Sequence, residues 1–155
     1  MMYAYLLSLH SLMRWLVLLS LVVTIVRAYS AWRSGLVFTP FDNALRHWTA
    51  TIAHIQLLIG LWLYLISPIV DYFLHNYTTA VHLREIRFFG MEHGLMMLIA
   101  IGVITVGSAK AKRKRTDAEK FKTIAIWFSV ALLIIFISIP WAFSPLVSRP
   151  HFRPF

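Results

Sequence analysis

The sequence predicts an all-α fold, an integral membrane four-helix bundle formed as a single domain by residues 1–155. Composition supports this first: 59% of the residues are hydrophobic, 14% are charged, and the mean hydropathy is +0.71. The apolar residues also gather into four runs of about 20 residues, enough to cross a hydrocarbon core of about 30 Å. Cations stand at the ends of these runs. A soluble domain of this length cannot bury so much apolar surface.

The first two segments are expected at residues 4–26 and 44–67. The first is followed by cations and aromatic residues, which are typical of a membrane interface. The second stops at Pro68, because proline cannot continue a helix. Asp42 or Asn43 is the expected N-cap of the second helix, since both side chains can accept hydrogen bonds from the first backbone amides.

The last two segments are expected at residues 88–107 and 121–143, with Pro140 in the last turn of the fourth. The connection at residues 69–87 mixes aromatic and charged side chains, so we expect a short amphipathic helix lying along the interface. The tail at residues 144–155 is rich in proline and is expected to extend along the membrane surface.

The charges of the loops predict how the chain is oriented across the membrane. Positive-inside counting favours the cytoplasm for the first and third loops, with both termini outside, in a bacterial plasma membrane. Because these charges flank apolar runs, we interpret them as topogenic or lipid-binding, with no nucleic acid as a partner. The sequence has no Cys, which excludes disulfides, thiolate metal sites, iron–sulfur clusters and covalent c-type haem. The third loop with its flanks carries Lys110, Lys112, Arg113, Lys114, Arg115, Lys120 and Lys122.

Five ionisable residues interrupt the apolar segments. Glu92 and His93 lie at the entry of the third, His10 and Arg14 share one helical face of the first, and His54 lies in the second. Ionisable groups inside a membrane are costly and are commonly functional. A structural alternative is that each histidine makes an interhelical hydrogen bond. These residues are the candidate site.

The three histidines of the spans differ in the depth that is expected for them in the membrane. At 1.5 Å per residue, His10 lies about 9 Å and His93 about 7 Å from the outer ends of their segments. His54 lies about 20 Å from that side, near the middle. Two histidines at equal depth on different helices can bind one metal from opposite sides. His10 and His93 are therefore the expected pair.

Neutral imidazole is the commonest metal ligand, and haem iron accepts two along one axis. We therefore predict haem b with His10 and His93 as ligands. His54 would be a third ligand in another pairing, a ligand to a second haem, or part of a quinone or proton site. Arg14 would bind a propionate or pair with Glu92. Glu92 would orient His93 or Arg14.

With these residues in view, the sequence resembles the small bacterial four-span membrane proteins labelled cytochrome b-like. The resemblance covers most of the chain. It implies b-type haem held by histidines and transmembrane electron transfer, with quinol as a possible electron donor. The chain has fewer paired histidines than the diheme four-span cytochromes, which leaves a second haem in doubt. The resemblance rests on LHSLMR at 9–14, AHIQLLIG at 53–60, EHGLMM at 92–97 and IPW at 139–141.

Two other function classes compete with a redox protein. The first is a non-enzymatic accessory or assembly subunit of a larger membrane complex, in which the intramembrane histidines and Arg14 are structural. The second is a transporter or proton relay through Arg14, Glu92 and His54. This last class ranks lowest, because the chain has few broken-helix signals. The partners expected are the lipid bilayer, a redox or complex partner, and a second copy in a homo-oligomer.

Overall fold

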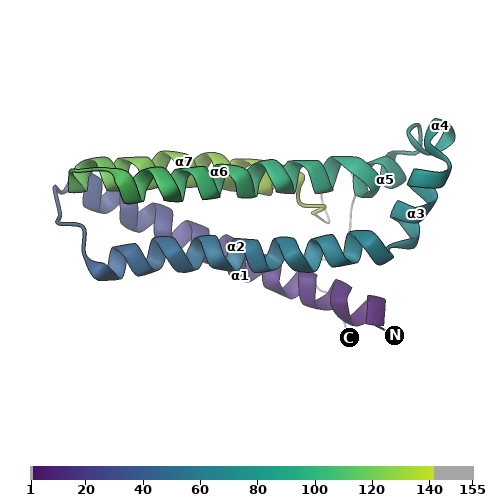
Figure 1. Cartoon of the computed structure of the whole chain (residues 1–155), viewed down its shortest axis with the longest axis horizontal. Coiled ribbons are helices and arrows are strands. Elements are labelled where there is room, and N and C mark those ends of the chain that lie inside the picture. The colour runs from purple at the N-terminus through teal and green to yellow at the C-terminus, as the bar shows by residue number, and fades with distance from the viewer. Residues whose placement is uncertain (1, 142–155) are drawn as a thin grey trace.

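The computed structural model describes residues 2–141 and folds them into long helices with a group of short ones at one end (Figure 1). No strand occurs in this described range, so the predicted all-α class is confirmed. In chain order the elements are α1 (Met2–Arg33), α2 (Pro40–Ile66), α3 (Pro68–His75), α4 (Tyr77–Ala80), α5 (Arg84–Arg87), the π-helix η1 (Phe88–Glu92), α6 (His93–Arg113) and α7 (Asp117–Ser138).

Within residues 2–141, four helices are long and apolar enough to cross a membrane. Many of their large apolar side chains point outward, such as Leu65, which is 83% exposed. Such a surface suits lipid tails and would be costly in water. The chain is therefore a multi-pass membrane protein. The four candidate spans are Met2–Arg33, Pro40–Ile66, Arg84–Arg113 and Asp117–Ser138.

The long helices form one bundle with two different ends. In Figure 1 the α1–α2 and α6–α7 loops lie together at one end, and α3, α4 and α5 lie at the other. α6 and α7 run side by side, whereas α1 and α2 cross and diverge toward the α3–α5 end. The end with the two loops is called the basic end below, because the cations of both loops gather there.

The helices start earlier than the apolar runs predict, because capping residues fix their ends. Thr39 is the N-cap of α2, where Asp42 or Asn43 was expected. The Thr39 hydroxyl accepts from the Asp42 amide, and the Asp42 carboxylate accepts from the Thr39 amide at 2.9 Å. Thr116 and Glu119 form the same capping box at the start of α7.

α7 ends at Ser138, so the prediction that the fourth helix reaches residue 143 with Pro140 in its last turn is wrong. Ile139 is extended, with φ −77° and ψ 132°. The residue before a proline is pushed out of the helical region by the proline ring, which explains the early stop. The predicted extended tail at residues 144–155 lies outside the described residues.

The predicted short amphipathic helix between the second and third spans is present as α3. Its Val70 and Phe73 are buried, while Asp71 and His75 are exposed and lie 3.2 Å apart (Oδ1 to Nδ1). This helix covers the end of the bundle beside η1. It therefore contributes to the walls of the candidate site.

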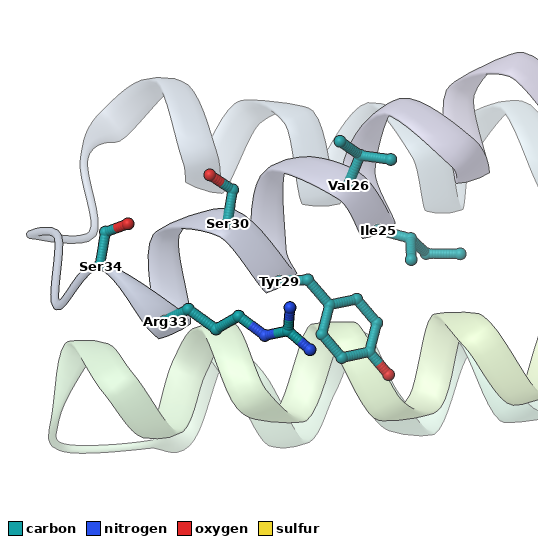
Figure 2. A pocket seen from close by; sticks show the side chains of 6 residues that line it. All are labelled: Ile25, Val26, Tyr29, Ser30, Arg33 and Ser34. Atoms are coloured by element: carbon teal, nitrogen blue, oxygen red, sulfur yellow. The ribbon is translucent and has the colours of Figure 1, made fainter.

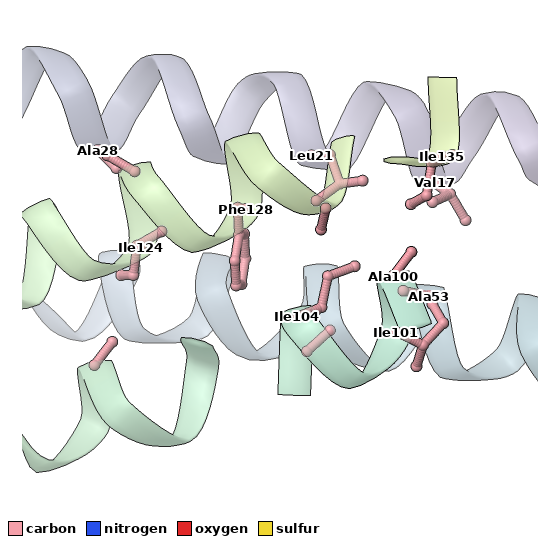
Figure 3. Packing of buried hydrophobic residues seen from close by; sticks show 14 of the residues in the cluster. Val17, Leu21, Ala28, Ala53, Ala100, Ile101, Ile104, Ile124, Phe128 and Ile135 are labelled. Atoms are coloured by element: carbon pink, nitrogen blue, oxygen red, sulfur yellow. The ribbon is translucent and has the colours of Figure 1, made fainter. Parts of the chain in front are cut away.

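Small residues line the helix contacts and let the backbones approach closely, as is common in membrane bundles. Figure 3 shows Leu21 and Ala28 of α1 facing Phe128 and Ile124 of α7, with Ala53 of α2 near Ala100 of α6. Phe128 is completely buried.

Hydrogen bonds and an ion pair between side chains join the helices in the basic half. The hydroxyls of Thr24 and Thr49 lie 2.7 Å apart between α1 and α2. Arg27 donates to Asp42 at 2.8 Å across the same pair of helices. Arg46 is buried and donates to the Ser108 side chain on α6. These contacts join α1, α2 and α6 near the basic end.

Candidate functional site

A cavity of about 780 Å³ opens at the end of the bundle opposite the basic end. It is bounded by α1, α2, α3, η1, α6 and the end of α7. Its volume lies in the range of about 300–1,000 Å³ typical of small-molecule and cofactor sites. The lining is mostly apolar, with a small set of polar side chains: Tyr3, His10, Ser11, Arg14, Gln56, Tyr64, Ser67 and His93.

The structure brings His10 and His93 together inside this cavity. Their ring centroids lie 6.4 Å apart, and the ring planes are inclined at 78°. His10 comes from α1 and His93 is the first residue of α6. The structure therefore places side by side the two histidines that the residue count assigned to similar depth.

The end of α7 holds the His93 ring. Nδ1 of His93 lies 2.9 Å from the Ser138 carbonyl oxygen. A carbonyl only accepts, so Nδ1 carries the proton and Nε2 keeps its lone pair. Ser138 is the last residue of α7, and its carbonyl is among those that an α-helix leaves without an intrahelical donor. The early stop of α7 thus supplies the acceptor that sets the His93 tautomer.

The π-helix η1 sets the direction of His93. A π turn contains one extra residue, which rotates the residues after it by about 100° relative to an uninterrupted α-helix. Gly90 lets the Phe73 ring of α3 pack directly on this turn, because a Cβ at this position would overlap that ring. The Tyr64 hydroxyl donates to the Gly90 carbonyl at 2.7 Å. Tyr64 of α2 and Phe73 of α3 therefore both contact the π turn just before His93.

His10 is held through its backbone and by close packing. Gln56 Nε2 donates to the His10 carbonyl at 2.9 Å. A Cβ at Gly60 would lie 3.1 Å from His10 Cε1, so the ring rests directly on α2. Within the described range, His10 Nδ1 and Gln56 Oε1 are buried and have no hydrogen-bond partner. The cavity therefore contains polar atoms whose hydrogen-bonding capacity the protein leaves unused.

Arg14 lines the same cavity one helical turn from His10, as their spacing predicts. Its guanidinium lies 5.4 Å from the Trp15 ring centroid and 5.8 Å from that of Trp141. Glu92 does not orient Arg14 or His93. Its carboxylate instead accepts from Arg87 Nε at 2.7 Å, because both side chains lie at the outer surface of the same continuous helix.

His54 lies outside this cavity. Its Nδ1 is 2.6 Å from the Ala50 carbonyl and its Nε2 is 3.1 Å from the Thr105 hydroxyl. The side chain is exposed between α2 and α6, toward the lipid-facing surface. The structure therefore separates His54 from the His10–His93 pair, and it gives no continuous path through Arg14, Glu92 and His54.

Four contributors to the site were not predicted from the sequence: Ser138, Gln56, Tyr64 and Gly60. Gln56 and Gly60 are four residues apart and share a helical face, a signal that was available beside His54. Ser138 acts through its backbone, which no side-chain pattern reveals. Among residues 2–141, no group of three or more His, Asp or Glu side chains is arranged to hold a metal ion.

No protein-family model, curated protein or solved structure matches the chain. The chemistry of the site therefore has to be argued from its own residues.

Proposed function

We propose that the chain is a haem b-binding integral membrane electron-transfer protein, with His10 and His93 as the axial ligands. The supporting observation is the 6.4 Å separation of the two ring centroids inside the 780 Å³ cavity. A metal–imidazole bond is about 2 Å long, so two imidazoles on opposite sides of one metal have centroids about 6 Å apart. The spacing of the rings fits one metal bound by both.

The small number of protein ligands also fits haem. A bare ion needs three or four ligands from the protein, and residues 2–141 offer no such group. Haem iron takes its equatorial ligands from the porphyrin and needs only axial ones from the chain. When bound, haem b would supply reversible one-electron chemistry.

The protein groups around the rings have definable roles in this proposal. The Ser138 carbonyl keeps the proton on Nδ1 of His93, orients the ring and raises the basicity of Nε2. Gly60 leaves room for the His10 ring. The apolar walls exclude water, and burial of this kind is one means by which a protein tunes a redox potential.

Arg14 is the proposed partner of a propionate carboxylate. It is the cation that lines the cavity, and guanidinium groups form strong charge-assisted hydrogen bonds with carboxylates. The Trp15 and Trp141 rings lie beside its guanidinium. Arg14 would then balance the charge of the bound group in an apolar region.

We further propose a bacterial plasma membrane with both termini outside, which puts the cavity toward the outer face. The charge of the first and third loops supports this orientation. A quinol is the proposed electron-exchange partner, because the cavity is walled by apolar spans that border the lipid.

The test is a reduced-minus-oxidised absorption spectrum of detergent-purified protein, with a pyridine haemochrome assay for stoichiometry. We expect a b-type spectrum near one haem per chain. His10→Ala and His93→Ala should each remove most of it. His54→Ala is the matched control, because it deletes a span histidine outside the cavity, and it should leave the spectrum intact. A colourless protein that also fails to bind added haem would refute the proposal.

Two observed hydrogen bonds also fit the accessory-subunit hypothesis. Hydrogen bonds from Gln56 to the His10 carbonyl and from His93 to the Ser138 carbonyl join different helices, as structural residues would. This hypothesis predicts no chromophore and co-purification with larger subunits. The spectrum therefore separates the two, and haem bound through His10 and His93 would favour the redox protein.

A further inference from the structure

A second hollow lies on the outer face of α1 at the basic end, far from His10 and His93. It is a groove of about 450 Å³ formed by one helix face. Figure 2 shows Arg33 and Tyr29 extended side by side along one edge and the Ser30 and Ser34 hydroxyls along the other. The lining residues are Ile25, Val26, Tyr29, Ser30, Arg33 and Ser34.

The chemistry of the groove changes in order along the helix axis. Val26, 62% exposed, and Ile25 form its apolar part. The hydroxyl side chains and the cation Arg33 lie further toward the C-terminus of α1, with the Arg33 Cα about 12 Å along the axis from that of Ile25. The Arg33 guanidinium turns back beside the Tyr29 ring (Figure 2). A phospholipid likewise passes from an apolar acyl chain to a polar glycerol and phosphate. An arginine that ends an apolar face also suits a lipid phosphate by charge-assisted hydrogen bonding.

The charges of the basic end are not balanced by the protein. Each carboxylate of the two loops and their flanks is already paired: Asp42 with Arg27 at 2.8 Å, Asp117 with Lys120 at 3.2 Å and Glu119 with Lys114 at 3.7 Å. Arg33 is exposed and makes no hydrogen bond or ion pair with another residue of the described range. An anion is therefore complementary to this groove.

We propose that this groove binds one anionic phospholipid, with its phosphate at Arg33 and its acyl chain along Ile25 and Val26. A second copy of the chain is a poorer occupant. A symmetric dimer about an axis along the membrane normal would bring two basic ends together, and like charges repel. The groove shares no residue with the cavity that holds His10 and His93. A test of lipid binding is therefore independent of the test of haem binding.

Native mass spectrometry of the detergent-purified, delipidated protein tests the proposal by titration with phosphatidylglycerol or phosphatidylcholine. We expect one saturable site that prefers phosphatidylglycerol. Arg33→Gln should weaken it about tenfold or more, the scale of a lost charge-assisted hydrogen bond. Arg115→Gln is the matched control, because it removes the same charge from an exposed position at the same end outside the groove. It should change the affinity by less than about threefold.

Equal weakening by the two substitutions would show a diffuse attraction to the basic end and would overturn the proposal. Equal affinity for the two lipids would overturn it as well, and so would displacement of the lipid by inorganic phosphate. Arg33 is exposed, so the variant is expected to fold, and an unchanged thermal unfolding midpoint without lipid checks this.

Discussion

At position 60, α2 comes so close to α1 that a side chain would press on the His10 ring. An added Cβ would lie 3.1 Å from His10 Cε1, whereas at Gly102 it would meet nothing within 4 Å. Gly60→Ala is therefore expected to displace the ring by a few tenths of an ångström. In the proposed haem site, displacement of the His10 ring should lower haem occupancy or change the low-spin signal in electron paramagnetic resonance.

Gly102→Ala is the control for this experiment, because it makes the same change within a span without a contact. It should leave the signal unchanged and should stabilise the helix by at most about 1 kcal/mol through propensity. Identical behaviour of the two variants would mean that the contact between Gly60 and His10 has no functional consequence. Thermal unfolding of the apoprotein separates a local effect on the ring from a loss of fold.

The same residues show what a sequence can predict about a membrane site. His10 and His93 were paired by counting residues from the segment ends, which works because a helix rises at a fixed 1.5 Å per residue. The same count placed His54 deeper, and in the structure His54 lies outside the cavity that holds the pair. Ser138 and Gly60 were not predictable, because their roles depend on which helix faces lie together, and that is set by packing over the whole bundle.

At the scale of whole elements, α1 and α2 are joined by a buried hydroxyl pair. Thr24 and Thr49 lie 2.7 Å apart, and both hydroxyls also lie near the Ser20 carbonyl. We expect a double-mutant cycle of Thr24→Val and Thr49→Val to give a coupling energy of about 0.6–2 kcal/mol, the scale of interhelical hydrogen bonds in membranes. The measurement is the free energy of unfolding in mixed micelles.

Thr123→Val is the control for the cycle. The Thr123 hydroxyl donates to the Glu119 carbonyl within its own helix at 2.7 Å, at an exposed position. Its loss should change the free energy of unfolding by less than about 0.5 kcal/mol. A coupling energy near zero for the Thr24–Thr49 pair would mean that apolar packing alone holds α1 against α2.

Helix ends were the least predictable elements, for a physical reason. Hydropathy marks only where a chain can sit in hydrocarbon, whereas the helices continue into the interface until a cap or a proline stops them. Thr39 and Thr116 start α2 and α7 ahead of their apolar runs. The π-helix before His93 has no hydropathy signal either, because it depends on Gly90 accepting the Phe73 ring.

Across the whole molecule, the two ends have different chemistry. One end carries the cations of two loops, and the other holds the cavity beneath the short helix α3. An asymmetric bundle of this kind has a preferred orientation in a membrane whose cytoplasmic side retains cationic loops. The proposed lipid groove and the proposed haem site would then lie toward opposite faces of the bilayer.

Orientation can be measured directly, because the chain contains no Cys and a single introduced thiol labels cleanly. Thr78→Cys in α4 and Ala118→Cys at the start of α7 each place an exposed thiol at one end. In intact cells we expect a membrane-impermeant maleimide to label Cys at 78 and to spare Cys at 118 until the membrane is opened. The reverse pattern would invert the proposed topology and put the cavity at the cytoplasmic face.

Replacing four cations of the third loop by Gln should make labelling mixed, because the charge difference between the ends is the proposed determinant of orientation. The four are Lys112, Arg113, Lys114 and Arg115.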